Sequence, residues 1–347
     1  LWLDATNVDG KQNDTLSNGS LVSEWKDLSG NLNDTTQSES QRRPKLIGNS
    51  LNNKSTIRFD GIKSNNGDYL KKSNGLQISN ELSIFVVTNK SSYGGAYEKI
   101  LAIRGSDGKH GHLISEGPSP NNFYVYASTP SGGYTNIIDT NSLGGALITN
   151  SSLGDGEISI SISGRLIGKK SHNYPVNGNE VLTLGWAYGS EYWDGDIAEV
   201  LIFNRALTTD EKININHYLA KKWGLQANVD SDDDNFSDLI ENQKGTSLTD
   251  PQSNPCFTNR RSISWSSSIS IKFHNDFNTD LKMYWLDYSG GLYSMGNITP
   301  GQKVSYNTYI THPWAFVDYQ TSKCVAYYDP VNSDNGKTIN LKNYSGN

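Results

Sequence analysis

Residues 193–225 read WDGDIAEVLIFNRALTTDEKININHYLAKKWGL, a strand pattern followed directly by a helix pattern. The apolar run Asp196–Phe203 predicts a buried strand. Thr208, with Glu211 three residues later, predicts a capping box at a helix start, and Gly224 supplies a C-terminal cap. The expected apolar stripe of this helix is Ile215, Tyr218, Leu219 and Trp223. We therefore expect one helix that packs against a sheet.

The composition of the whole chain favours β-structure. The 347 residues suggest two or three domains, and the low hydrophobic fraction of 35% excludes a helical bundle or coiled coil. Disorder is excluded by 19 Tyr, 9 Phe and 8 Trp, whose rings supply large apolar surfaces. A net charge of −6 without basic clusters argues against a nucleic-acid partner. No apolar run approaches the ~18–20 residues of a membrane span.

Short alternating segments separated by Asn, Gly and Ser predict strands along both halves of the chain. The expected strands lie at 56–59, 82–87, 123–126, 157–162, 196–203, 269–273, 282–286, 303–306 and 315–317. We predict an all-β protein: a large sandwich with one helix, a linker, and a small C-terminal β-sandwich. The expected boundaries are 1–226, 227–255 and 256–347.

The segment Asp230–Glu241, DSDDDNFSDLIE, carries oxygen donors at the spacing of an EF-hand-type calcium loop. Asn235 stands where such loops have Gly, and Asn tolerates positive φ. The expected ligands are Asp230, Asp232, Asp234, Phe236 through its carbonyl, Asp238 and Glu241. We predict bound Ca²⁺; the alternative is a solvated acidic linker.

No helical stripe flanks this loop in the following GTSLTDPQ segment, so a sensor-type helix pair is not expected. The run DSDDDNFSDLIENQKGTSLTDPQ instead resembles a thrombospondin type 3 repeat. That resemblance implies a calcium-stiffened connector between extracellular domains.

Several segments of residues 1–225 together resemble laminin-G-like domains of the concanavalin A-like jelly-roll superfamily. They are LWLDATN, VSEWKDLSGNLND, TIRFDG, LSIFVV and the stretch quoted first. The resemblance implies two packed antiparallel sheets and a role in binding carbohydrate or another ligand.

Aromatic residues in Gly-rich segments of this half could stack on a sugar ring. The candidates are Tyr93, Tyr97, Tyr134, Trp186, Tyr188, Tyr192 and Trp193. We expect Tyr188, Tyr192 and Trp193 to form the surface that stacks on the ligand. Trp186 is predicted to be a core residue.

The hypothesis that this domain is an enzyme rests on the motif Asp194-x-Asp196-x-x-Glu199. Glycoside hydrolases of the same superfamily carry Glu-x-Asp-x-x-Glu on one strand. On a regular strand Glu199 would face away from the other two, so a bulge would be needed. We therefore expect no enzymatic activity.

Residues 260–317 resemble the β domain of the von Hippel-Lindau tumour suppressor. The motifs are ISIKFHN around Phe273, YWLDY from Tyr284, ITPG from Ile298 and TYITHPW from Thr308. The resemblance implies a small β-sandwich with a peptide pocket at Trp285, Thr308, Tyr309, His312 and Trp314. Met295 and Asn307 depart from that pocket, which puts hydroxyproline recognition in doubt; core aromatics are the alternative.

The only two cysteines, Cys256 and Cys324, bracket the C-terminal sandwich. We predict a disulfide, with two buried thiols as the alternative, and an extracellular setting.

Together these features predict a secreted or surface-exposed bacterial protein of the adhesin type that binds calcium and carbohydrate or protein ligands. One alternative is a structural surface or filament subunit that assembles with flanking domains or other subunits. A second alternative is an accessory region of a polysaccharide-degrading enzyme.

Overall fold

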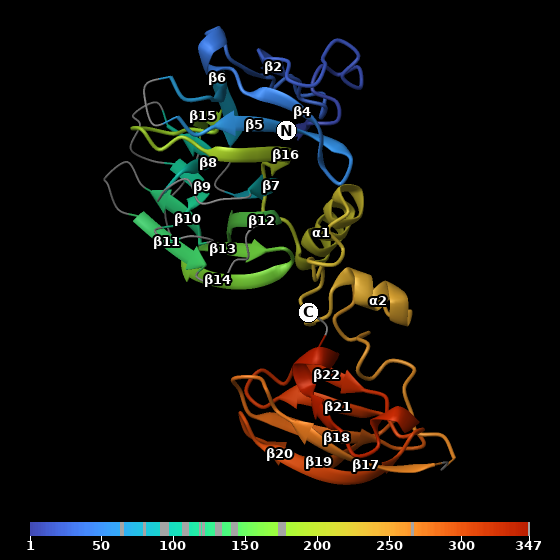
Figure 1. Cartoon of the computed structure of the whole chain (residues 1–347). Helices are drawn as coiled ribbons and strands as arrows, with labels where there is room; N and C mark the ends of the chain where they lie inside the picture. Colours follow the sequence, from blue (N-terminus) through green and yellow to red (C-terminus); the bar gives the residue numbers. More distant parts are fainter. Residues whose placement is uncertain are drawn as a thin grey trace. The chain divides into compact units, whose positions relative to one another are not determined.

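The computed structural model describes residues 1–62, 66–78, 81–90, 97–105, 111–117, 119, 122–128, 134–139, 145–172, 178–264 and 267–345. It divides into two compact units, Leu1–Leu225 and Gln226–Asn347, which Figure 1 shows in blue to yellow and in orange to red. The all-β prediction is confirmed, since sheets form the body of both units.

The first unit contains two eight-stranded sheets. One has the order β14-β13-β12-β7-β16-β5-β4, with β1 also paired to β16. Its strands are β1 (Trp2–Asp4), β4 (Lys45–Leu51), β5 (Lys54–Asp60), β7 (Leu82–Lys90), β12 (Gly145–Gly154), β13 (Glu157–Ile162), β14 (Arg165–Ser171) and β16 (Asp194–Phe203).

The other sheet of the first unit has the order β11-β10-β9-β8-β15-β6-β3-β2. Its strands are β2 (Glu24–Trp25), β3 (Thr35–Thr36), β6 (Leu70–Ile78), β8 (Lys99–Arg104), β9 (Gly111–Glu116), β10 (Phe123–Ser128), β11 (Tyr134–Asp139) and β15 (Gly178–Leu184). A short 3₁₀ turn, η1, covers Ser40–Arg42. Buried His112 of β9 contacts Ser151 of β12 at 2.9 Å, so the two sheets meet face to face as a sandwich.

Helix α1 (Thr209–Trp223) begins and ends as predicted. The side chain of Thr208 accepts from the N–H of Glu211, and the Glu211 carboxylate accepts from the N–H of Thr208. Gly224 ends the helix in the left-handed conformation. The buried face differs in part from the prediction: Leu219 and Trp223 lie on it, but Tyr218 is exposed. The other buried side chains are Ile213, Asn216 and Ala220.

The second unit contains a three-stranded sheet, β20-β17-β23, and a four-stranded sheet, β19-β18-β21-β22. Its strands are β17 (Ser268–His274), β18 (Leu281–Leu286), β19 (Leu292–Ile298), β20 (Lys303–Tyr309), β21 (Trp314–Asp318), β22 (Cys324–Tyr328) and β23 (Thr338–Asn340). Helix α2 covers Asp238–Lys244, and the 3₁₀ turns are η2 (Asn332–Asp334) and η3 (Leu341–Tyr344). Phe273, Phe316 and Tyr328 lie in the core between the sheets.

The segment predicted as a linker, 227–255, groups with the second unit. Phe236 is fully buried against Leu286, Ala315 and the two cysteines. The short helix α2 was not expected, because its seven residues are too few to show an apolar stripe in the sequence.

Candidate metal centre and aromatic faces

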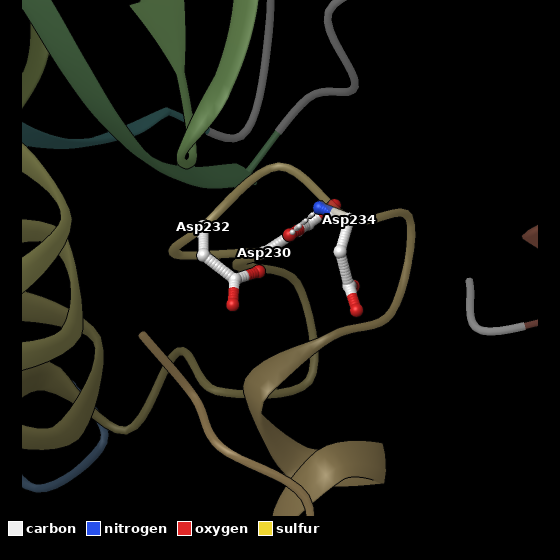
Figure 2. Close-up of side chains that lie close together, drawn as sticks. All are labelled: Asp230, Asp232 and Asp234. Atoms are coloured by element: carbon white, nitrogen blue, oxygen red, sulfur yellow. Dashed lines mark hydrogen bonds between the residues drawn. The ribbon is translucent and has the colours of Figure 1, made fainter. Parts of the chain in front are cut away.

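Asp230, Asp232 and Asp234 converge within the loop that precedes α2. One carboxylate oxygen of each lies within 4.8 Å of the others, and all three residues are buried. Figure 2 shows the three side chains coming from one tight turn. The turn needs left-handed backbone at Asp233 and Asn235, whose φ angles are 60° and 80°. Asn235 thus replaces the usual Gly without losing the turn.

Backbone amides hold part of this acidic set in place. The two oxygens of Asp230 accept from the N–H groups of Asp234 and Asn235 at 3.0 and 2.8 Å. Oδ1 of Asp234 accepts from the N–H of Phe236 at 2.8 Å. These bonds fix the carboxylates of Asp230 and Asp234, so this part of the site is preorganised.

Four carboxylate oxygens at this centre have no hydrogen-bond partner among the described residues. Both oxygens of Asp232, Oδ2 of Asp234 and Oε2 of Glu241 are buried and accept no hydrogen bond from the described residues. Burial, reinforced by Asp232 and then Asp234, raises the pKa of Glu241 to about 9. A buried charge without a partner is costly, and hard oxygen donors in this number suit a hard cation such as Ca²⁺.

Two other predicted ligands, Asp238 and Phe236, also make contacts within the second unit. Both oxygens of Asp238 accept from Ser231, one from its N–H and one from its hydroxyl, each at 2.9 Å. Asp238 therefore joins the start of α2 to the loop. The ring of Phe236 lies in the core of the second unit and its N–H contacts Asp234, so this residue anchors the loop.

The structure corrects the predicted platform of the first unit. Tyr192 is 3% exposed and Trp193 is 1% exposed, so neither ring is available at the surface. Tyr192 stacks on Trp186 with ring centroids 5.9 Å apart, and the Lys90 ammonium lies 4.3 Å from the Trp193 ring centroid. The Gly-rich sequence suggested an open loop, but Tyr192 packs on Trp186 of the same segment and Trp193 is covered by Lys90 of the distant strand β7. Tyr188 alone of the three is exposed.

A different set of rings forms a continuous series, here called the tyrosine row: Tyr97, Tyr124, Tyr126 and Tyr134. Successive ring centroids lie 5.7, 6.1 and 5.4 Å apart. Tyr97 and Tyr134 are exposed, and Tyr134 is the most open at 62%. Tyr93, also a candidate, lies outside the described residues.

Strand register explains the row. Tyr124 and Tyr126 point to one face of β10 because they are two residues apart. Ser128 of β10 lies opposite Tyr134 of β11, which brings Tyr134 to the same face. Leu113 and Ala102 form the floor beneath Tyr124 and Tyr126. The amide of Asn136 donates to the hydroxyl of Tyr124 at 3.1 Å.

Cations border this face at Tyr188. The Arg104 guanidinium lies 4.7 Å from the Tyr188 ring centroid, and the Lys99 ammonium lies 5.2 Å from it. Rings, amides and hydroxyls in one exposed surface can stack on and hydrogen-bond a sugar. The Tyr-x-Tyr pair of β10, Tyr124 and Tyr126, is the sequence feature that could have indicated this face.

Two of the three carboxylates in the proposed catalytic motif, those of Asp196 and Glu199, are held by other side chains. Asp196 accepts from the Arg58 guanidinium at 2.7 and 3.0 Å and from the hydroxyls of Ser50 and Thr56. Glu199 is fully buried and accepts from several donors at once. The bulge needed near Glu199 is present, between Ile197 and Glu199, but it turns the carboxylate toward α1.

The residues of the predicted pocket in the second unit fall into two groups. Trp314 and Thr308 are buried, and the Trp314 indole N–H donates to the Thr308 hydroxyl at 3.1 Å. These two residues are therefore not a ligand floor. Trp285, Tyr309 and His312 instead form a ring cluster with the exposed Tyr288 and Tyr293.

The predicted disulfide is confirmed. Cys256 and Cys324 are joined across 68 residues, with Cα atoms 6.5 Å apart. Within the described part of the chain, no helix is both long and apolar enough to cross a membrane.

Comparison with solved structures returns sandwich proteins at low similarity. A heptameric SAP-like pentraxin from Limulus polyphemus has 13% identity and a TM-score of 0.39, covering 50% of this chain and 82% of its own. Domain 4 of the arabinanase AbnA from Geobacillus stearothermophilus, bound to arabinotriose, has 16% identity and a TM-score of 0.39, covering 48% and 77%. The binding domain of Paraclostridial Mosquitocidal Protein 1 has 12% identity and a TM-score of 0.40, covering 92% and 71%. Similarity at this level does not indicate which ligand this chain binds.

Among curated proteins, none matches the chain. One family model does match: residues 260–332 fit the VHL beta domain. The match confirms the resemblance predicted for the C-terminal sandwich.

Proposed function

We propose that this chain is an extracellular, calcium-binding protein of the adhesin type, whose first unit binds carbohydrate through the tyrosine row. The observation that carries the proposal is the row itself: four rings in series, two of them exposed, on one face of a sheet. A protein ligand is the second candidate occupant of this face.

Calcium binding is the second part of the proposal. It is supported by four buried carboxylate oxygens without partners in a preorganised loop. Asp232, Asp234 and Glu241 would hold the ion, and Asp230 would complete the set. The ion would neutralise charges that otherwise repel one another inside the second unit.

An extracellular location and a binding role without catalysis are also proposed. The disulfide supports the location, because such bonds persist in oxidising compartments. The binding role is supported by the engagement of Asp196 and Glu199 in ion pairs. Hydrolysis of an oligosaccharide by the purified chain would contradict this part.

A glycan array tests the carbohydrate proposal. The full chain should give saturable binding to one class of saccharide, and Tyr126→Ala should weaken it by about tenfold, as expected for loss of a stacked ring. Tyr319→Ala is the matched control, because Tyr319 is an exposed tyrosine of the second unit. Silence across the array would contradict carbohydrate binding and favour the structural-subunit alternative. An equal loss in both variants would show that the row is not the site.

A further inference from the structure

Three charged side chains of the first unit meet where β1, β16 and α1 come together. The Lys222 ammonium lies 2.7 Å from Oδ2 of Asp4 and 2.7 Å from Oε2 of Glu199. Glu199 is fully buried, Asp4 is buried, and the Lys222 side chain is 17% exposed. An amine and a carboxyl that are 218 residues apart in the sequence are thus in direct contact.

Aromatic rings enclose the three groups. The Lys222 ammonium lies 5.4 to 5.8 Å from the ring centroids of Trp2, Tyr218 and Trp223. The same rings hold Glu199, which accepts from the indoles of Trp2 and Trp223 at 2.8 and 2.6 Å and from the Tyr218 hydroxyl at 3.1 Å. The carboxylate is therefore fixed beside the amine in a site with little water.

The carboxyl of Asp4 is polarised on the side away from the lysine. Its Oδ1 accepts from the N–H of Thr6 at 2.8 Å and from the Thr6 hydroxyl at 2.7 Å. Two donors on one oxygen would stabilise the negative charge that forms there when a nucleophile attacks the carboxyl carbon. Oδ2, the oxygen that contacts Lys222, is then the leaving oxygen.

We propose that Lys222 and Asp4 condense to an intramolecular isopeptide bond, with Glu199 as the group that moves the protons. The lysine nitrogen forms a bond to Cγ of Asp4, and the bond from Cγ to Oδ2 breaks. Of the three protons on the ammonium, one stays on the amide and two leave with Oδ2 as water. The reaction needs neither an oxidant nor a co-reactant.

Glu199 is placed to make this step possible. The attacking amine must first lose a proton. Burial disfavours the charge on Lys222, but Glu199 and Asp4 outweigh burial and keep the pKa of the amine above its ordinary value. A raised pKa opposes loss of this proton to solvent, so the step depends on the Glu199 carboxylate, which lies 2.7 Å from the amine, takes the proton and passes it to Oδ2 of Asp4. Fixed reacting groups in contact gain the large effective molarity of an intramolecular reaction.

The bond would tie the first strand of the unit to its last helix. Residues 4 and 222 lie close to the two ends of the unit, which covers Leu1–Leu225. A pull on both ends of the unit would then be carried by a covalent bond. Such a tie suits a protein exposed to mechanical load outside the cell.

A second triad in the same unit offers a matched control. The Lys26 ammonium contacts Glu24 and Asp34, each at 2.9 Å, so it also has one Glu and one Asp partner. The Lys26 and Glu24 side chains are 39% and 42% exposed, and water solvates the groups. The same pairing without enclosure should therefore remain an ion pair.

Intact-mass spectrometry of the purified full chain, with the Cys256–Cys324 disulfide reduced, followed by peptide mapping, tests the proposal. The wild type and Lys26→Arg should be lighter than their sequences by one water and should give a branched peptide that joins Asp4 to Lys222. Lys222→Arg keeps the positive charge but should have its full sequence mass. Glu199→Gln should leave most of the protein unlinked.

Three results would overturn the proposal. The first is a wild type at full sequence mass after prolonged incubation. The second is a lost water that persists in Lys222→Arg, which would indicate a succinimide elsewhere in the chain. The third is formation of the Asp4–Lys222 bond in Glu199→Gln at the wild-type rate, which would show that Glu199 does not transfer the protons. Because the wild-type mass is decisive alone, a variant that fails to fold does not block the test.

Discussion

Replacing Asp232 with asparagine should change the stability of the second unit in opposite directions with and without calcium. Both oxygens of Asp232 are buried beside Asp234 and Glu241 and have no hydrogen-bond partner in the part of the chain that the structure describes. Without the ion, Asp232→Asn removes one repelling charge, so the variant should be more stable than the wild type. With the ion, the wild type gains binding free energy that the variant has largely lost.

The size of the effect follows from linkage. At a free Ca²⁺ concentration a hundred times Kd, binding adds about 2.7 kcal/mol to the free energy of unfolding. A unit the length of residues 226–347 shifts in Tm by about 4 °C per kcal/mol, so calcium should raise the wild-type Tm by about 10 °C. Calorimetry in EDTA and in excess Ca²⁺ measures this difference.

The matched control is Asp250→Asn, an exposed aspartate of the same segment. It should keep the full calcium response, whereas Asp232→Asn should show almost none. The reasoning is refuted if the wild-type Tm is the same in EDTA and in calcium. It is refuted equally if Asp232→Asn is less stable than the wild type in EDTA, because the loop would then not contain uncompensated charge.

Three further predictions concern the folds themselves. Reduction of Cys256–Cys324 should destabilise the second unit by roughly 4 kcal/mol in denaturant titrations, and no change would contradict a stabilising bond. Burial, and then the nearby Asp60, raises the pKa of Asp68 to about 7. A carboxyl whose pKa is raised by folding stabilises the fold below its unfolded pKa near 4, and this contribution is lost as the pH rises toward 7. The free energy of unfolding should therefore fall less between pH 4 and pH 7 in Asp68→Asn than in the wild type. Equal falls would contradict the raised pKa of Asp68. Thr208→Ala should lower the free energy of unfolding of the first unit by about 1 kcal/mol through loss of the helix cap, and a neutral result would show that the cap is dispensable.

Local sequence signals were sufficient for several elements. The capping box at Thr208 and the glycine at 224 define α1 because a helix end depends on residues within one turn. The left-handed turn at Asn235 is equally local. The predicted strands follow from alternation, which needs only neighbours in the sequence.

The ligand face depended on information that is not local. Tyr126 and Tyr134 meet only because β10 and β11 pair in one register. Trp193 lies in a Gly-rich segment that resembles a loop, yet Lys90 from β7 covers its ring. Burial by a strand a hundred residues away leaves no mark in the local sequence, so the wrong rings were expected at the surface.

The contact between Asp4, Glu199 and Lys222 has the same origin. Asp4 lies opposite Glu199 because β1 pairs with β16, and α1 then returns Lys222 to both. Each residue alone is an ordinary charged residue in the sequence. Only the pairing of the first and last strands of the unit brings the three together.

Carbohydrate binding at the tyrosine row is the central claim, and a titration followed by NMR tests it most directly. The saccharide class that binds on the array is added to protein labelled on tyrosine rings. The account predicts saturable shifts of the ring signals of Tyr124, Tyr126 and Tyr134, with those of Tyr319 and Tyr328 unmoved. Shifts confined to rings of the second unit, or none at saturating saccharide, would contradict it.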